Sequence, residues 1–256
     1  MVARDSRRAF LTIAGTGVLL TACRKGERAE PEGVTPSTDA QAAPTASGGQ
    51  PPKEEKSDDV GATEDLMREH GVIRRILVVY RESAARLRVR PASVPPDSLQ
   101  KAAKLMRSFG EDYHEKLLEE ANIFPALTKD GGAIASQITA LIAQHQRGRE
   151  ITEYVLGVTQ KPIDAANSGP LALTLEAFAR MYEEHAALED TVVFPAWKKA
   201  LTTRQLDAMG DLFEDIEKKM LGKDGFDDAV DRIATIEKAL GIELGAMTAP
   251  PPPTPG

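Results

Sequence analysis

The stretch DYHEKLLEEANIFPAL (Asp112–Leu127) has a close counterpart later in the chain, MYEEHAALEDTVVFPAW (Met181–Trp197). Both contain an aromatic residue, acids, a histidine and a leucine before a Phe-Pro-Ala sequence. Apolar residues in both recur at spacings of three and four, which is the pattern of an amphipathic helix. The repetition predicts two related helices of one bundle.

The same spacing predicts an all-α protein: an up-down four-helix bundle with one or two extra C-terminal helices. We expect the first helix to follow Thr63 as its N-cap residue and to end before Pro91. Three more long helices are expected, the last beginning with Pro170 in its first turn. The expected ranges of these three helices are 99–128, 133–159 and 167–201, and the C-terminal helical region expected to pack across the bundle is 203–240.

The chain has only four histidines, and one falls on each predicted bundle helix. A single histidine on such a helix is commonly a surface or core residue, but one on every helix points to a shared site. Imidazole and carboxylate ligands without thiolates suit iron, manganese or zinc. Two carboxylates among four histidines favour two metals, because a carboxylate can bridge a pair of ions. The histidines are His70, His114, His145 and His185.

Four blocks in order resemble the hemerythrin-like (HHE) domain over about residues 67–199: EDLMREH, EDYHEKLLEEANIFPAL, QHQRGR and HAALEDTVVFPAW. The resemblance implies a four-helix bundle holding a non-haem centre of two iron ions. It implies His70, His114, His145 and His185 as ligands, with Glu119 and Glu189 as bridging carboxylates. Respiratory hemerythrins use five histidines, so one position here is left to water, another carboxylate or an external ligand.

The spacing in the two motifs differs by one residue. Glu189 lies four residues after His185, on the same helix face, whereas Glu119 lies five after His114 and would be rotated by about 140° in an α-helix. Glu119 could be reached through a π-bulge, Glu115 could replace it, or this half of the site could be broken. The equal distance from each glutamate to Phe-Pro favours a π-type turn around 116–118.

Other motif residues have structural interpretations as well. Phe124 and Phe194 are expected to pack beside the site, with the following prolines interrupting the helix. Tyr113 and Tyr182 are interpreted as core residues, or alternatively as hydrogen-bond donors to a ligand. A group of acids is expected mainly on the solvated face, although Glu115 and Asp190 could supply a missing ligand; the group is Glu115, Glu120, Glu184 and Asp190.

The chain ends predict segments outside the bundle. Residues 1–22 resemble a Tat-type signal peptide with SRRAFL and a short apolar run, or a Sec leader that happens to hold two arginines. LTAC before residue 24 resembles a lipobox, with Cys23 as the lipidated residue; the alternative is an ordinary cysteine after an uncleaved leader. Residues 23–62 are expected to be a disordered linker, 63–244 the bundle and 245–256 a disordered Pro-rich tail.

The charge limits the possible partners. The leader carries three arginines against one aspartate, so its removal takes the formal net charge from -7 to -9. An acidic domain argues against nucleic acid. The expected partners are a small diatomic ligand or peroxide and, through the lipid anchor, a bacterial membrane facing the periplasm, with the outer membrane as one option. The redox partner is not identified by the sequence.

Three functions remain open at this stage. The first is a di-iron protein that binds or senses O₂, NO or peroxide, or holds iron. The second is a di-iron oxidase or peroxidase with open metal positions, and the third is a structural bundle without metal. A haem bundle would leave the acids unexplained, and the chain has no CxxCH motif for covalent attachment.

Overall fold

The computed structural model describes residues 60–129 and 131–253. Within these ranges the chain forms helices and no β-strand. The predicted leader, Cys23 and most of the predicted linker lie outside the described residues, as do the last three residues of the predicted tail. No helix among the described residues combines the length and the apolar character needed to cross a membrane.

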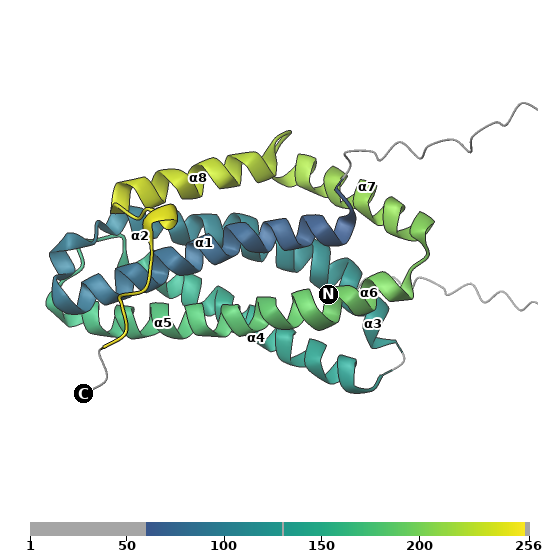
Figure 1. The fold of residues 1–256 in the computed structure, drawn as a ribbon, viewed down its shortest axis with the longest axis horizontal. Coiled ribbons are helices and arrows are strands. Elements are labelled where there is room, and N and C mark those ends of the chain that lie inside the picture. The colour runs from purple at the N-terminus through teal and green to yellow at the C-terminus, as the bar shows by residue number, and fades with distance from the viewer. Residues whose placement is uncertain (1–59, 130, 254–256) are drawn as a thin grey trace, which may run out of the picture. The chain divides into compact units, whose positions relative to one another are not determined.

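Four long helical segments form the bundle (Figure 1). The first is α1 (Ala62–Val89), and the second is continuous through α2 (Pro96–Leu105), η2 (Met106–Ile123) and α3 (Phe124–Thr128). The third is α4 (Ala133–Val158), and the fourth is continuous through α5 (Ala165–Leu188), η3 (Glu189–Val193) and α6 (Phe194–Ala200). The α1 segment packs against the second and fourth segments, and α4 packs against the same two, which closes the ring of four.

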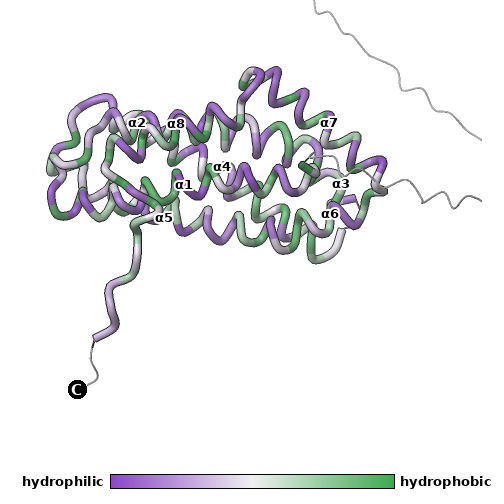
Figure 2. Tube along the Cα trace, turned by 45° about the horizontal axis from the view of Figure 1, so that its top comes forward, coloured by the Kyte–Doolittle hydropathy of each residue, from purple (hydrophilic) through white to green (hydrophobic). Residues whose placement is uncertain are grey.

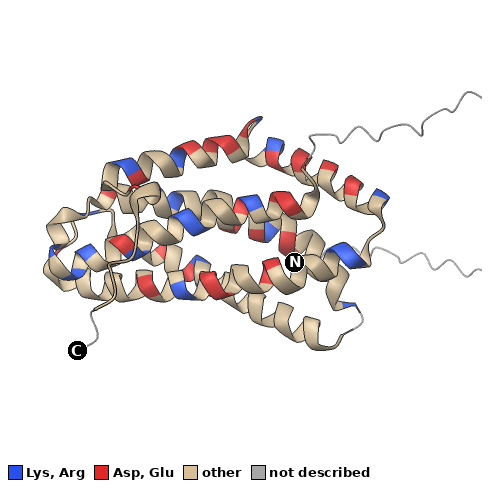
Figure 3. Ribbon diagram, viewed as in Figure 1, with Lys and Arg blue, Asp and Glu red and all other residues tan. Residues whose placement is uncertain are grey.

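The extra C-terminal region forms two helices, α7 (Thr203–Met220) and α8 (Gly225–Leu240). Both lie along α1, with α8 also against α2 and α7 against η2, so they run lengthwise on the bundle and not across it (Figures 1 and 2). Acidic residues are frequent on both helices (Figure 3). Buried Glu237 of α8 binds Arg75 of α1 through two hydrogen bonds of 2.9 and 2.5 Å.

Local sequence explains where several of the helices begin or end. The Thr202 and Gln205 side chains form a capping box at the start of α7. Gly241 ends α8 in the left-handed conformation, with φ of 61°. Between the second and third segments, Gly131 and Gly132 have φ of 69° and 87°, which suits residues without a Cβ.

Two predicted helix starts are wrong. Thr63 is not the N-cap of α1: the helix begins at Ala62 after Gly61, and no side chain caps it. Pro170 is not in the first turn of the fourth segment, because α5 begins at Ala165, where the Asp164 side chain accepts a hydrogen bond from the Asn167 N–H. The carboxylate cap directly before Ala165 therefore determines this start, and Pro170 lies further into the helix.

The predicted π-type turn is confirmed, and it is longer than expected. The whole of η2 is a π-helix of 18 residues, including the predicted 116–118. Its i→i+5 hydrogen bonds make five residues complete about one turn, so Glu119 faces the same side as His114. A second, unpredicted π segment, η3, follows His185 and has five residues.

Both π segments end at the same place in the motif. The Phe124 N–H donates to the Glu119 carbonyl, and the Phe194 N–H donates to the Glu189 carbonyl. Each phenylalanine precedes a proline, whose ring has no N–H and crowds the carbonyl four residues earlier in an α-helix. The wider π turn before each proline is consistent with this crowding. The predicted role of proline as an interruption of the α-helical hydrogen bonding is confirmed.

Candidate metal centre

Six predicted site residues meet inside the bundle. His70 lies on α1, His114 and Glu119 on η2, and His145 on α4. His185 lies in the last turn of α5, and Glu189 begins η3. Each of the six is at most 3% exposed. The four helical segments therefore place two carboxylates and four imidazoles in one enclosed space.

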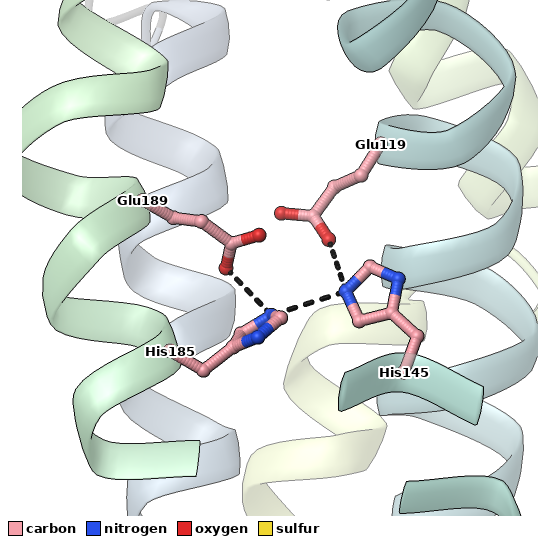
Figure 4. Close-up of side chains that lie close together, drawn as sticks. All are labelled: Glu119, His145, His185 and Glu189. Atoms are coloured by element: carbon pink, nitrogen blue, oxygen red, sulfur yellow. Dashed lines mark hydrogen bonds and ion pairs between the residues drawn. The ribbon is translucent and has the colours of Figure 1, made fainter. Parts of the chain in front are cut away.

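The histidine rings form two pairs on either side of the glutamates. The rings of His70 and His114 are 4.8 Å apart, and those of His145 and His185 are 4.7 Å apart. Figure 4 shows the second pair pointing toward Glu119 and Glu189. Each pair thus lies against the same two carboxylates, an arrangement suited to two metal ions sharing both glutamates.

Distances between the facing atoms support this pairing. Glu119 Oε1 lies 3.4 Å from His114 Nε2, and its Oε2 lies 3.3 Å from His145 Nε2. Glu189 Oε2 lies 3.4 Å from His70 Nε2 and 3.0 Å from His185 Nε2. Each glutamate therefore reaches one histidine of each pair, as a bridging carboxylate would.

Among the described residues, the buried carboxylate oxygens of this centre have no hydrogen-bond partners. Both carboxylate oxygens of Glu119 and of Glu189 are without a partner, as is His114 Nε2. Buried polar atoms are rarely left unpaired, because each costs about 1–3 kcal/mol. Bound cations would satisfy all of these atoms, so the donor set fits a pair of metal ions.

The outer nitrogen of each histidine is already paired. His70 Nδ1 lies 2.7 Å from Asp190 Oδ1, and His145 Nδ1 lies 2.8 Å from Glu120 Oε1. His114 Nδ1 lies 2.5 Å from Glu69 Oε2, and His185 Nδ1 lies 2.9 Å from Gln144 Oε1. An Nδ1–H that donates to such an acceptor leaves the Nε2 lone pair free to bind metal.

The buried glutamates and histidines of the site shift one another's pKa values in the directions that favour ionised carboxylates balanced by positive charge. Burial raises the pKa of Glu119, but His114 and His145 outweigh it and hold that pKa well below its usual range. Burial lowers the pKa of His145, but Glu115, Glu119 and Glu120 raise it to about 10. The pKa of His114 is likewise raised, because Glu119 and Glu69 outweigh its burial. In the absence of metal, protons on the imidazoles would balance the carboxylates.

The aromatic residues of the motifs lie where the sequence predicts. Phe194 stacks on His70, with ring centroids 5.3 Å apart, and Phe124 stacks on His145, with ring centroids 5.6 Å apart. Tyr113 and Tyr182 are buried core residues, and each donates a hydrogen bond to a carboxylate beside the site. Tyr113 binds Glu69 at 2.6 Å, and Tyr182 binds Glu115 at 2.7 Å.

Three acids assigned mainly to the solvated face lie elsewhere. Glu115 is buried and Asp190 and Glu120 are half-buried, and all three contact the outer side of a histidine. Glu115 and Asp190 approach the Nδ1 atoms of His145 and His70 and not the Nε2 atoms that face Glu119 and Glu189. Burial raises the pKa of Glu115 to about 8. Glu184 is exposed, as predicted.

Two acceptors were missed by the sequence reasoning. Glu69 and Gln144 each directly precede a histidine in the chain, yet each binds the histidine of a neighbouring helix. The signal was the repeated order of residues in EHGVIR (69–74) and QHQRGR (144–149), where an acceptor precedes the histidine and an arginine follows four residues later.

Comparison with known proteins agrees with this geometry. The family model described as "Hemerythrin HHE cation binding domain" matches residues 61–197. The chain belongs to the hemerythrin HHE family. The matched residues include all six of the site, whereas α7 and α8 follow the match.

Relatives of the HHE protein include uncharacterized proteins of Mycobacterium tuberculosis and Mycobacterium bovis. Each is 44% identical over 185 residues, which covers 72% of this chain and 71% of the relative. No solved structure matches the chain. The family description supports cation binding, in agreement with the buried histidine and glutamate clusters.

Proposed function

We propose that this HHE domain binds two iron ions and uses them to bind or sense O₂, NO or peroxide, or to hold iron. The observation that carries the proposal is the set of four unpartnered carboxylate oxygens of Glu119 and Glu189, facing four imidazole Nε2 atoms in an enclosed space. His70 and His114 would hold one ion, and His145 and His185 the other.

The arrangement supports small-molecule binding because it supplies few protein ligands. Two imidazoles and two shared carboxylates give each ion four donor residues, and iron in nitrogen and oxygen sites commonly accepts more. The remaining positions are open to a diatomic molecule, peroxide or water. When bound, iron would supply Lewis acidity and electron transfer. The chain itself orients the imidazoles through their Nδ1 partners and excludes bulk water by burying the centre.

The closest alternative is a di-iron oxidase or peroxidase. It is favoured by the same open positions, and by Tyr113 and Tyr182, whose hydroxyl groups form hydrogen bonds with carboxylates next to the centre. Exposure of the reduced protein to O₂ separates the two functions. A stable and reversible adduct supports binding or sensing, whereas rapid oxidation with turnover of an added reductant supports an enzyme.

Metal analysis of the purified domain, paired with an absorption spectrum, tests the proposal. We expect two irons per chain and an oxo-bridged ferric spectrum. His185→Ala and Glu189→Ala should lower the iron content, while Glu184→Ala, an exposed neighbour, should leave it unchanged. A folded, colourless protein with under half a metal per chain after growth in iron-rich medium would refute a di-iron function.

We also propose that the domain is exported and anchored by lipid on Cys23, on a bacterial membrane facing the periplasm. The support is the sequence SRRAFL at 6–11 and LTAC at 20–23. Metabolic labelling with a radioactive fatty acid should mark the wild-type protein, and Cys23→Ala should abolish the label. Labelling that persists in Cys23→Ala would contradict the anchor.

A further inference from the structure

The outer contacts of the centre repeat with approximate twofold symmetry. His70 is backed by Asp190 and then Arg74, and His145 is backed by Glu120 and then Arg149. Each arginine lies four residues after its histidine, and each acid directly follows a glutamate of the centre. The same residue types therefore support one histidine of each pair.

The other two histidines, His114 and His185, also have outer contacts at matching positions in the sequence. The residue before His70, which is Glu69, binds His114 Nδ1, and the residue before His145, which is Gln144, binds His185 Nδ1. These two contacts occupy matching places in the two halves. They differ in chemistry, because one acceptor is a carboxylate and the other a neutral amide.

This difference acts on ligand strength. A carboxylate that accepts from Nδ1–H makes the imidazole a more basic metal ligand than an amide oxygen does. It also allows only one orientation of the ring proton, because a carboxylate has no donor to offer. The amide of Gln144 has both an oxygen and an NH₂ group, so it can satisfy either tautomer of His185 and fixes the required one less strongly.

Glu69 is itself held firmly. It is 1% exposed, its Oε2 binds His114 Nδ1 at 2.5 Å, and its Oε1 accepts from the Tyr113 hydroxyl at 2.6 Å. Both oxygens are therefore used, and the carboxylate cannot turn away without losing two buried hydrogen bonds. In the other half of the site, the corresponding tyrosine, Tyr182, donates its hydrogen bond to Glu115 and not to Gln144. Gln144 therefore lacks the tyrosine contact that holds Glu69.

We infer that the two metal positions are inequivalent, and that the position of His70 and His114 binds metal more tightly than the position of His145 and His185. The reason is that the Glu69 carboxylate accepts from His114, whereas the neutral Gln144 amide accepts from His185. The inference rests on the proposed two-metal function and deepens it. Glu69 and Gln144 are positioning residues that act through His114 and His185. Changes to such outer contacts typically alter metal affinity by about 10- to 100-fold.

The test is an anaerobic calorimetric titration of the full metal-free protein with Co²⁺, followed in parallel by its visible absorption bands. Wild type should bind two ions in two steps whose dissociation constants differ by about tenfold or more. Glu69→Gln should raise the dissociation constant of the tighter step, and Gln144→Glu should lower that of the weaker step. Each variant should therefore reduce the difference between the two dissociation constants. The double variant, Glu69→Gln with Gln144→Glu, should reverse the order in which the two positions bind Co²⁺.

Two ligand variants identify the steps. His114→Ala should remove the tighter step, and His185→Ala the weaker one. Two identical binding constants in wild type, or exchange variants that shift both steps equally, would overturn the inference and leave the two-metal function intact. Absence of Co²⁺ binding by folded wild-type protein would instead refute the proposed function itself. Circular dichroism of each variant verifies that it is folded.

Discussion

Gly148 on α4 provides the space that the Tyr182 side chain occupies. A Cβ built on Gly148 would lie 1.9 Å from the Tyr182 hydroxyl oxygen and 2.8 Å from the ring carbon that bears it. Real Cβ contacts are never so short, so Gly148→Ala must displace a ring that is only 2% exposed. The displaced hydroxyl would lose its hydrogen bond to Glu115.

The expected cost follows from these contacts. Overpacking of a core typically costs about 1–3 kcal/mol. The lost hydrogen bond costs about 0.5–1.5 kcal/mol, because the raised pKa of Glu115 leaves its carboxyl mainly uncharged near neutral pH. Alanine offsets about 1 kcal/mol, because it favours a helix more than glycine does. We expect Gly148→Ala to lower the free energy of unfolding by about 0.5–3.5 kcal/mol.

Gly157 offers a matched control on the same helix. It is exposed, and a Cβ there would meet nothing within 4 Å. Gly157→Ala should therefore stabilise the protein by up to about 1 kcal/mol. Urea unfolding followed by circular dichroism measures both variants. Equal stabilisation by the two changes would show that Tyr182 does not fill the space beside Gly148.

Three further predictions follow from the site and the C-terminal helices. Adding Fe²⁺ anaerobically to a free concentration of about 100 times its dissociation constant should stabilise the metal-free protein by about 2.7 kcal/mol per site and raise its thermal midpoint; calorimetry that shows no rise would contradict this. Glu119→Ala should abolish most of that rise, because it removes the carboxylate that reaches both histidine pairs, whereas exposed Glu184→Ala should preserve it. Arg75→Met should lower the free energy of unfolding in urea by about 1–3 kcal/mol, since it leaves the buried Glu237 carboxylate without its partner. The control, Arg81→Met, breaks an exposed ion pair and should change the free energy of unfolding by less than about 1 kcal/mol. Equal effects of the two variants would argue against the α1–α8 contact.

The sequence predicts the helices well because apolar spacing over long segments is a strong signal. The four helical segments and the fold class follow from it. The first residue of a helix is harder to predict, since residues that could each cap it lie within a few positions of one another. Asp164 and Pro170 are both suitable signals for the start of one helix, and the choice depends on a hydrogen bond that spacing does not reveal.

The inner site was easier to predict than its outer contacts. The histidines are rare, and Glu119 and Glu189 occur in a repeated motif, so their grouping could be inferred. Glu69 and Glu120 resemble ordinary surface acids in the sequence, because their binding partners lie on other helices. The π-helix was inferred from a spacing of five residues, but its full length depends on packing along η2.

The burial of the centre has a consequence for electron exchange. All six site residues are at most 3% exposed. None of them lines either of two surface cavities in the described part of the chain, one of about 670 Å³ beside α7 and α8 and one of about 510 Å³ beside α2 and α8. If metal is bound there as proposed, a bulky reductant could not touch it without local unfolding. We therefore expect electrons to reach the centre through the protein from a donor at the surface, so that the rate of reduction depends on the distance to that donor and not on its fit to a pocket.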